Sequence, residues 1–312
     1  MTISYAGQRV LVTGASGFIG TALVTRLISD GAEVHAVSRH AQPASADLRW
    51  WQADLADAEA TRRLVASMNP DVVFHLASYV AGGRDLALVS TTLHSNLLST
   101  VNLLTSLVEH GCSSVVLAGS MEEPLEGADT PGSPYAAAKW ASSGYARMFH
   151  ALYALPVATA RIFMTYGPGQ SDRTKLIPYV TEQLLRGEEP RLTSGDRLVD
   201  WIYVDDVAEG VLSIGLHPEA AGETIDLGSG QLTSIRGVVE HLVRVANPEV
   251  TPQFGAIPAR PMEHSRVADV HASDDLIGWR PTTSLEEGLA RTVDWYRAHP
   301  VAEVATTGDR QT

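Results

Sequence analysis

The sequence predicts an α/β protein in which a doubly wound parallel sheet is joined to a smaller second domain. Short apolar runs alternate with amphipathic segments through the first half of the chain, which is typical of a parallel sheet covered by helices on both faces. A glycine-rich turn stands between the first apolar run and the first amphipathic segment. After Phe163 the alternation becomes less regular, and Pro and Gly are frequent in residues 171–200 and 231–285.

The apolar runs predict buried strands, and each is followed by a segment with helical spacing of its apolar residues. The strands are expected at residues 10–12, 33–37, 72–76, 114–117 and 157–163, with another before Asp54. The helices are expected to end at Gly31 and to cover 57–68, 88–110 and 134–153. Further strands are expected at 201–204 and 224–227, and a capping box at 284–287 predicts a final helix.

Length and composition narrow the class of protein. The chain has 312 residues, of which 45% are hydrophobic and 19% charged, so it can bury a sizeable core. Its net charge of −13 disfavours a surface built to neutralise phosphates, so we expect no nucleic-acid partner. No stretch approaches the ~20 apolar residues that cross a bilayer, so we expect no membrane partner. The single cysteine, Cys112, excludes an intramolecular disulfide and fits the reducing cytoplasm.

Gly14, Gly17 and Gly20 follow the first strand and open the first helix. Gly14 permits a tight turn, Gly17 lets a pyrophosphate approach the backbone, and Gly20 lets helix and strand pack closely. The free N–H groups at the start of the helix can then bind the anion. This pattern indicates a Rossmann fold that binds a dinucleotide. The residues expected to contact the cofactor here are Gly14, Ser16, Gly17, Phe18, Ile19 and Gly20.

The end of the second strand bears on which dinucleotide is bound. NAD-binding folds carry an acid about 20 residues past the glycines, where it accepts hydrogen bonds from the ribose 2′-OH. Ser38 and Arg39 stand at this place instead, and an arginine can pair with a 2′-phosphate. We therefore expect NADP(H) to be favoured, with NAD(H) as the alternative. Asp54 and Leu55 end the next strand, where Asp54 either caps the following helix or meets the adenine.

Further motifs resemble those of the extended short-chain dehydrogenase/reductase family, which includes nucleotide-sugar epimerases, dehydratases and reductases. The resemblance covers nearly the whole chain. Its motifs are the glycine turn, Phe74-His75-Leu76-Ala77, Asn96 with Thr100 and Asn102, Ser120, Tyr135-x-x-x-Lys139, Tyr166-Gly167-Pro168-Gly169, Tyr203-Val204-Asp205-Asp206-Val207 and Gly278-Trp279-x-Pro281. The resemblance implies a nucleoside-diphosphate sugar as partner and a homodimer formed through helices 88–110 and 134–153. It also implies cofactor contacts at Leu76, Ala77, Ser78, Asn96, Tyr135 and Lys139.

The family fold is a Rossmann domain with a smaller C-terminal α/β substrate-binding domain. We expect residues 1–166 together with 201–230 to form the NADP-binding Rossmann domain. The substrate-binding domain is expected to comprise 167–200 and 231–300, followed by a flexible tail at 301–312.

Tyr135 and Lys139 lie four residues apart, hence on one face of a helix. A phenol with a pKa of about 10 is a weak base at neutral pH, and a nearby ammonium and a positive nicotinamide ring favour the phenolate. Tyr135 can then exchange a proton with a sugar hydroxyl or ketone while hydride moves to or from the nicotinamide. Ser120 can hydrogen-bond the same oxygen. We expect no metal, since no cluster of His, Asp and Glu has the spacing of metal ligands. We interpret His75 as a residue at the end of a strand, near the cofactor.

Two glutamates follow Ser120. In the family's dehydratases an acid pair at this place eliminates water across C5 and C6, but here Met121 stands where those enzymes carry aspartate. The run Gly119-Ser120-Met121-Glu122-Glu123 is similar to that of the family's 4-keto-6-deoxy-sugar reductases. We take Glu122 as a catalytic candidate and expect Glu123 to lie on a solvated loop face.

The substrate side departs from the family pattern at two places. Met164 stands where the family usually carries an asparagine, and Val199 stands where an arginine usually precedes the aspartate. Arg197, two residues earlier, is a substitute for that arginine. A diphosphate needs a bidentate donor, and Arg260 is the best candidate for it. The residues expected to contact the substrate are Ser120, Met164, Lys175, Arg197 and Arg260, with Arg266 a weaker candidate.

Together these features favour an enzyme that uses NADPH to reduce the C4 ketone of a nucleoside-diphosphate-linked 4-keto-6-deoxyhexose. The alternative is a 4-epimerase, which oxidises and re-reduces C4 with a retained NAD(P). A third hypothesis is a 4,6-dehydratase that uses Glu122. A protein that only senses NADP is disfavoured, because it has no need of Ser120, Tyr135 and Lys139.

Overall fold

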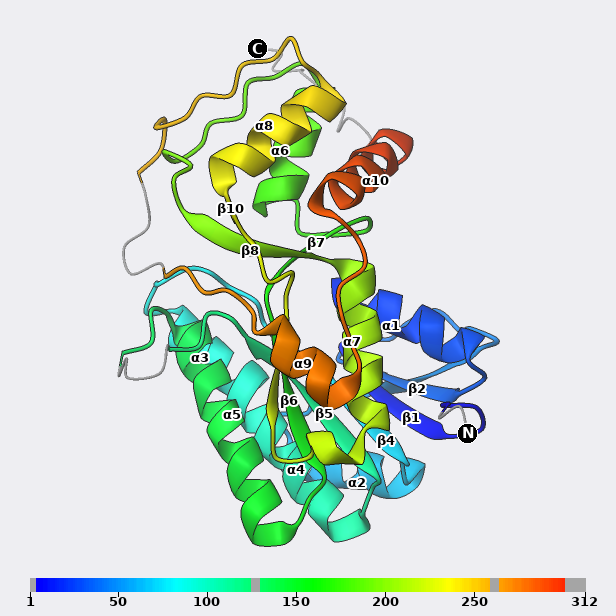
Figure 1. Cartoon of the computed structure of the whole chain (residues 1–312). Coiled ribbons are helices and arrows are strands. Elements are labelled where there is room, and N and C mark those ends of the chain that lie inside the picture. Colours follow the sequence, from blue (N-terminus) through cyan, green and yellow to red (C-terminus); the bar gives the residue numbers. More distant parts are fainter. Residues whose placement is uncertain (1–3, 125–129, 259–263, 301–312) are drawn as a thin grey trace, which may run out of the picture.

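A computed structural model describes residues 4–124, 130–258 and 264–300. The chain forms two lobes, a larger one built on a seven-stranded sheet and a smaller one built on a three-stranded sheet (Figure 1). Two sequence predictions, Arg260 and the tail at 301–312, lie outside the described residues. Within those residues no helix is both long and apolar enough to cross a membrane.

The strands of the larger sheet are all parallel and lie in the order β3-β2-β1-β4-β5-β6-β9. They are β1 (Arg9–Thr13), β2 (Glu33–Ser38), β3 (Leu48–Gln52), β4 (Val72–His75), β5 (Ser114–Ser120), β6 (Val157–Ile162) and β9 (Thr224–Leu227). The order changes direction between β1 and β4, and in sheets of this kind ligands bind at that point, outside the carboxyl ends of the strands. The predicted doubly wound sheet is therefore confirmed.

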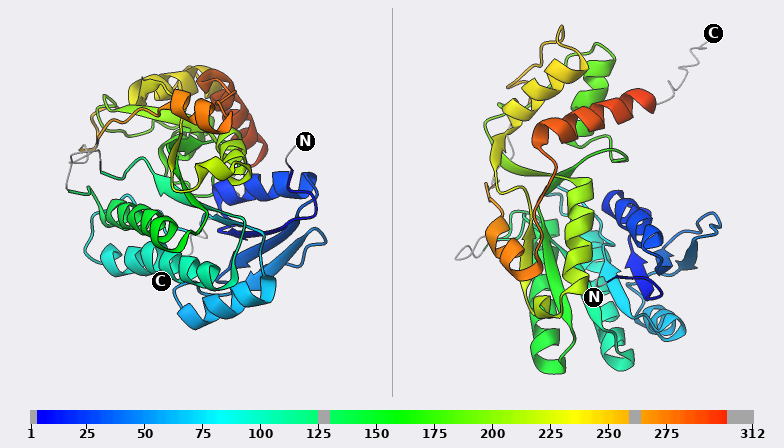
Figure 2. Two further views of the ribbon diagram at one scale, coloured as in Figure 1. Left: turned by 60° about the horizontal axis from the view of Figure 1, so that its bottom comes forward. Right: turned by 45° about the vertical axis from the view of Figure 1, so that its right-hand side comes forward.

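Helices cover both faces of this sheet (Figure 2). On one face α1 (Phe18–Ser29) and α7 (Val204–Leu216) pack together over one hydrophobic core. On the other face α2 (Ala58–Met68), α4 (Ser99–His110) and α5 (Pro134–Tyr153) enclose a second core. The sheet is thus buried on both sides, as its apolar strands require.

The helix predicted at 88–110 is not a single α-helix. It consists of α3 (Leu88–Thr92), a π-helical segment at Leu93–Leu98 and α4. The wider π turn contains Asn96, whose side chain and carbonyl both bond to neighbouring segments. The hydrophobic spacing predicted the helix but not this turn, because the turn depends on partners outside the helix.

The smaller lobe contains a sheet in the order β10-β8-β7. It comprises β7 (Met164–Tyr166), β8 (Leu198–Tyr203) and β10 (Leu232–Ser234), packed with α6 (Leu176–Leu185), α8 (Ile235–Ala246) and α10 (Leu285–Ala298). The strand predicted at 201–204 pairs here with β7 and not in the larger sheet, because Trp201 and Tyr203 pack in this third core. Two short elements, η2 (Pro218–Ala220) and α9 (Val270–Ile277), lie beside the larger sheet.

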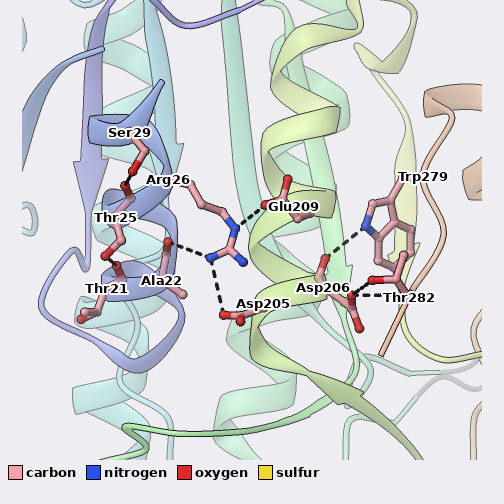
Figure 3. Close-up of polar contacts among 10 residues, drawn as sticks. All are labelled: Thr21, Ala22, Thr25, Arg26, Ser29, Asp205, Asp206, Glu209, Trp279 and Thr282. Carbon is pink, nitrogen blue, oxygen red and sulfur yellow. Dashed lines mark hydrogen bonds and ion pairs between the residues drawn. The ribbon is translucent and has the colours of Figure 1, made fainter. Parts of the chain in front are cut away.

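Ion pairs join α1 to α7, the two helices that cover one face of the sheet (Figure 3). The Arg26 guanidinium bonds to the carboxylate of Glu209 and lies 3.5 Å from that of Asp205. Since α1 begins at the glycine turn, this contact fixes the turn relative to α7.

The carboxylate of Asp206, near the start of α7, anchors the segment that leads to α10 (Figure 3). It is 4% exposed and accepts hydrogen bonds from the N–H and hydroxyl groups of Thr282 and from the N–H of Thr283. The indole N–H of Trp279 donates to the Asp206 carbonyl. The smaller lobe is therefore held to a helix of the larger one by buried polar contacts.

Candidate active site

The glycine turn lies at the carboxyl ends of β1 and β4, where the strand order changes direction, and we call this place the crevice. Gly14 has φ +70°, and a Cβ there would lie 2.7 Å from the Ala77 nitrogen. A Cβ at Gly20 would lie 2.1 Å from the Gly14 carbonyl oxygen. Gly17 caps α1 without a side-chain hydrogen bond, and the first turn of the helix carries no acid. The turn therefore offers backbone N–H groups at a helix N-terminus, which fits the phosphates of a dinucleotide.

The end of β4 lies against this turn through a chain of buried hydrogen bonds. The Thr13 hydroxyl accepts the N–H of Ala77 at 3.1 Å and lies 2.8 Å from Nδ1 of His75. Nε2 of His75 lies 3.0 Å from the Thr100 hydroxyl. Burial and the charge of Lys139 lower the pKa of His75 to about 3, so the ring is neutral. His75 is thus a strand-end residue, and the described part of the chain contains no cluster of metal-ligand side chains.

Asn96 holds the loop that follows β4. Its Oδ1 accepts the N–H of Tyr79 at 2.7 Å and the hydroxyl of Ser78 at 3.2 Å, while its Nδ2 donates to the Tyr79 carbonyl at 3.1 Å. All polar atoms of the amide are therefore used inside the protein. The structure places Ser78 and Asn96 beside the crevice, with Asn96 supporting its loop.

The ends of β2 and β3 lie farther along the same edge of the sheet. The Ser38 hydroxyl accepts the N–H of His40 at 3.2 Å and a bond from the Gln42 amide at 3.1 Å. The Arg39 side chain is exposed. Asp54 does not cap α2: its carboxylate accepts the N–H of Ala56, whereas Asp57 accepts the N–H of Ala60 and caps the helix. Leu55 is buried.

Ser120, Tyr135 and Lys139 meet at the end of β5. Ser133 accepts the N–H of Ala136 at 3.1 Å, and this cap starts α5 immediately before Tyr135. One turn later, the Lys139 ammonium lies 5.9 Å from the centre of the Tyr135 ring and donates to the Ala118 carbonyl at 2.7 Å. Ser120 is 6% exposed. The structure therefore brings the three predicted side chains together at the end of β5, where Tyr135 also contacts Ser120 and Ser78.

Burial dominates the electrostatic state of Tyr135 and Lys139. Burial raises the pKa of Tyr135 to about 12, and the charges of Glu122 and Glu123 add to this, while contacts with Ser120 and Ser78 oppose it. Burial lowers the pKa of Lys139 to about 8, and Glu123 opposes that shift. In the chain without its cofactor, burial and the two carboxylates therefore keep the Tyr135 phenol protonated at neutral pH. That the ammonium and a positive nicotinamide ring together favour the phenolate stays a prediction.

The two glutamates after Ser120 have opposite environments. Glu122 is part-exposed, and Arg197, reaching from the smaller lobe, lies 3.3 Å from its carboxylate. Glu123 is 5% exposed and accepts the N–H of Ser120 at 2.8 Å and the Ser143 hydroxyl at 2.9 Å. The expectation of a solvated Glu123 is therefore wrong: the chain turns after β5 and directs this side chain back under the strand.

The residues predicted to contact the substrate are dispersed. Met164, on β7, packs between the first and third cores. Lys175 precedes α6 and is part-buried, and Arg197 also donates to the His264 carbonyl at 3.3 Å. Arg266 donates to the Glu123 carbonyl at 3.3 Å. Of this group, Arg197 and Arg266 thus lie next to the Ser120 segment.

We did not predict a role for Asp200 from the sequence. The Asp200 carboxylate is fully buried and accepts the N–H groups of Ser229, Gly230 and Ala268. It joins the small sheet to the turn after β9 and to the segment before α9. The glycines at 228 and 230 were the available signal, since a Cβ at Gly228 would lie 2.9 Å from this carboxylate.

A glycine turn on a parallel sheet, facing a buried serine, tyrosine and lysine, defines a nicotinamide-dependent enzyme of the short-chain dehydrogenase/reductase type. The sequence model of the NAD dependent epimerase/dehydratase family matches residues 10–228. The chain belongs to this family, whose relatives include nucleotide-sugar epimerases and dehydratases.

Relatives of known name align along almost their whole length. The chain is 30% identical to a UDP-glucose 4-epimerase of Mycolicibacterium smegmatis, over 93% of this chain and 99% of the relative. It is 29% identical to a UDP-glucuronate 4-epimerase of Thermodesulfobacterium geofontis, over 91% and 95%. It is 28% identical to dTDP-glucose 4,6-dehydratase 1 of Escherichia coli, over 93% and 92%.

Solved structures agree with these matches. The UDP-glucose 4-epimerase of Thermotoga maritima, solved with UDP-glucose, superimposes with a TM-score of 0.86 at 25% identity, covering 93% of this chain and 99% of that one. The UDP-glucose 4-epimerase of Thermus thermophilus, solved with NAD, gives a TM-score of 0.80 at 27% identity over the same shares.

Proposed function

We propose that this protein is a nucleotide-sugar 4-epimerase that retains its nicotinamide cofactor through the reaction. The observation that carries the proposal is the group of Ser120, Tyr135 and Lys139 at the crevice of the glycine turn. The names of the relatives support epimerisation over the reduction that we first expected, because the relatives reported above are 4-epimerases and a 4,6-dehydratase.

When bound, a nicotinamide would supply hydride transfer from C4 of the sugar and back to the opposite face of the resulting ketone. Tyr135 takes the proton of the C4 hydroxyl and gives it back when the ketone is reduced. The Ser120 hydroxyl hydrogen-bonds the same oxygen and orients it. Lys139, charged below a pKa of about 8, stabilises the tyrosine in its deprotonated form.

The experiment that tests the proposal follows sugar isomers and cofactor together. Purified protein is incubated with UDP-glucose, UDP-glucuronate or their C4 epimers, and the isomers are separated while absorbance at 340 nm is recorded. Interconversion without net change of reduced cofactor is the expected outcome. Absence of interconversion with every sugar, while a keto-sugar nucleotide consumes NADPH, would replace the epimerase with the reductase.

The reductase remains the second candidate because of the run Gly119–Glu123. The dehydratase is less well supported. Elimination of water needs an acid and a base beside C5 and C6, whereas Glu122 is paired with Arg197 and Met121 cannot transfer a proton.

We further propose that NADP(H) binds more tightly than NAD(H). Within the described residues no hydrogen bond or ion pair holds the Arg39 guanidinium, so it is available for a 2′-phosphate beyond β2. The Thermus relative was solved with NAD, so titration of this protein with both cofactors is the decisive measurement.

We also propose a homodimer in the cytoplasm. Large apolar side chains are exposed on the neighbouring helical segments α3, the π turn, α4 and α5. They are Val89, Leu93, Leu98, Val108, Trp140, Tyr145, Leu152 and Tyr153. Such a surface favours a second copy of the chain over water. Light scattering should give a mass in solution of twice that of one chain. The Trp140→Glu variant should give a lower mass, because the charge weakens the contact between the two copies.

A further inference from the structure

The carboxylate of Glu123 lies behind the residues proposed to react with the sugar. Its Oε1 accepts the backbone N–H of Ser120 at 2.8 Å, and its Oε2 accepts the hydroxyl of Ser143 at 2.9 Å. Ser143 lies on α5 one turn after Lys139. One side chain therefore connects the end of β5 to the helix that carries Tyr135 and Lys139.

The strand makes room for this carboxylate at Gly119. A Cβ on Gly119 would lie 2.9 Å from Oε1 of Glu123 and 2.7 Å from a methyl carbon of Thr159. The glycine of the run 119–123 thus serves the buried acid, because a larger residue would displace it from the Ser120 N–H.

Glu123 is buried without forming an ion pair among the described residues. An unpaired buried charge is costly, and a glutamine could form both of its hydrogen bonds. The two hydrogen bonds alone therefore do not explain why this buried residue is a glutamate and not a glutamine.

The charged groups around Glu123 indicate what a carboxylate does at this position. On α5, the charge of Glu123 opposes the lowering of the Lys139 pKa by burial. The same charge contributes to the raised pKa of Tyr135. From the segment before α9, Arg266 donates to the Glu123 carbonyl and is itself stabilised by the carboxylate. Glu122, the adjacent acid, raises the pKa of Tyr135, whereas Glu123 is the carboxylate that opposes the effect of burial on Lys139.

Two further charges lie behind Arg266. The Arg161 guanidinium, on β6, is 2.8 Å from the carboxylate of Asp226 on β9. Burial is the main cause that lowers the pKa of Arg266, and Arg161 adds to it, whereas Asp226 and Glu123 oppose it. Glu123 therefore acts on Arg266 as well as on α5.

We propose that Glu123 is a positioning residue of the active site: it ties Ser120 to α5 and places a fixed negative charge behind Tyr135 and Lys139. The catalytic consequence rests on the proposed function, whereas the electrostatic effect on Lys139 does not. With this charge present, Lys139 stays protonated to higher pH. Without it, more of the lysine loses its proton near neutrality.

The sequence offers a direct measurement, since it contains only two lysines, Lys139 and Lys175. In protein labelled with ¹³C at lysine Cε, the titration of each is followed by NMR, and Lys175→Arg assigns the signals. We expect Glu123→Gln to move the Lys139 midpoint to lower pH. A folded Glu123→Gln protein with an unmoved Lys139 midpoint would overturn the proposal.

Two controls separate charge from packing. Glu122→Gln removes the neighbouring carboxylate and should leave the Lys139 midpoint in place. Ser143→Ala removes one hydrogen bond of Glu123 but keeps its charge, so it should lower thermal stability without lowering the midpoint. If Glu123→Gln does not fold, Glu123→Leu replaces it, since apolar residues often substitute for buried charges. The midpoint must fall in that variant too.

Activity provides a second readout. Because Glu123 raises the pKa of both Tyr135 and Lys139, its loss should shift both limbs of the pH profile of kcat/KM to lower pH. Cofactor affinity should stay unchanged. Were the wild-type protein inactive on all sugar nucleotides, the proposed function would fail, yet the NMR titration would still decide the role of Glu123.

Discussion

The crevice has two walls of different construction. The wall at the ends of β1 and β4 is made of backbone: Gly14 and Gly20 leave no space for a Cβ, and α1 begins there without a side-chain cap. The wall at the end of β5 is made of side chains whose partners come from distant segments, such as Ser143 and Arg197. Damage to the first wall should therefore impair cofactor binding and stability, whereas damage to the reacting side chains of the second should impair chemistry and leave cofactor binding intact.

The largest effect is expected on the side-chain wall. Tyr135→Phe keeps the ring and removes the proton that the proposed reaction needs. Proton transfer of this kind contributes ~10²–10⁴-fold, so kcat should fall by at least that much. Cofactor affinity, measured by fluorescence titration, should not change. Turnover close to wild type would refute the division of labour between the walls.

The matching change on the backbone wall is Gly20→Ala. The added Cβ would lie 2.1 Å from the Gly14 carbonyl oxygen, so the turn must move. We expect a loss of about 3 kcal/mol in the free energy of unfolding, together with weaker cofactor binding. Gly17→Ala is the control, because its Cβ would come no closer than 3.1 Å to that oxygen. Equal urea midpoints for the two variants would contradict this account.

The next prediction concerns Arg39, after the end of β2, and the preference for NADPH over NADH. A charged hydrogen bond from Arg39 to a 2′-phosphate is worth ~1.5–3 kcal/mol, which is roughly ten- to a hundred-fold in preference for NADPH over NADH. Arg39→Ala should abolish the preference, and adding Ser38→Asp should invert it. Equal binding of the two cofactors to the wild type would show that Arg39 remains in solvent.

The smallest effect is expected at His75, which joins the two strands of the backbone wall. Its pKa is about 3 in the folded chain against 6.5 when exposed, so the unfolded chain binds more protons between these values. Stability should therefore fall as pH drops below 6.5, by about 2 kcal/mol between pH 7 and pH 5. The free energy of unfolding of His75→Gln, measured by urea titration, should lack this decrease between pH 7 and pH 5. If the variant shows the same decrease as the wild type, other groups are responsible for it.

The two walls also differ in how far they could be predicted. The glycine turn, the strand before it and the helix after it follow from local spacing and sterics, and the structure confirms them. Ser120, Tyr135 and Lys139 were identified by motif and do lie together. Glu123 and the π turn at Asn96 were not predicted correctly, because each depends on hydrogen bonds to segments far away in the chain.

The sequence by itself determined the parallel sheet, the glycine turn and the identity of the family, since these depend on residue type at short spacing. Only the tertiary structure decided that Glu123 is buried and Glu122 is paired with Arg197. It also decided that β7 and β8 form a separate sheet. The physical reason is that burial and charge pairing are set by which segments meet in space, and adjacent glutamates in one loop carry no local signal of which will be covered.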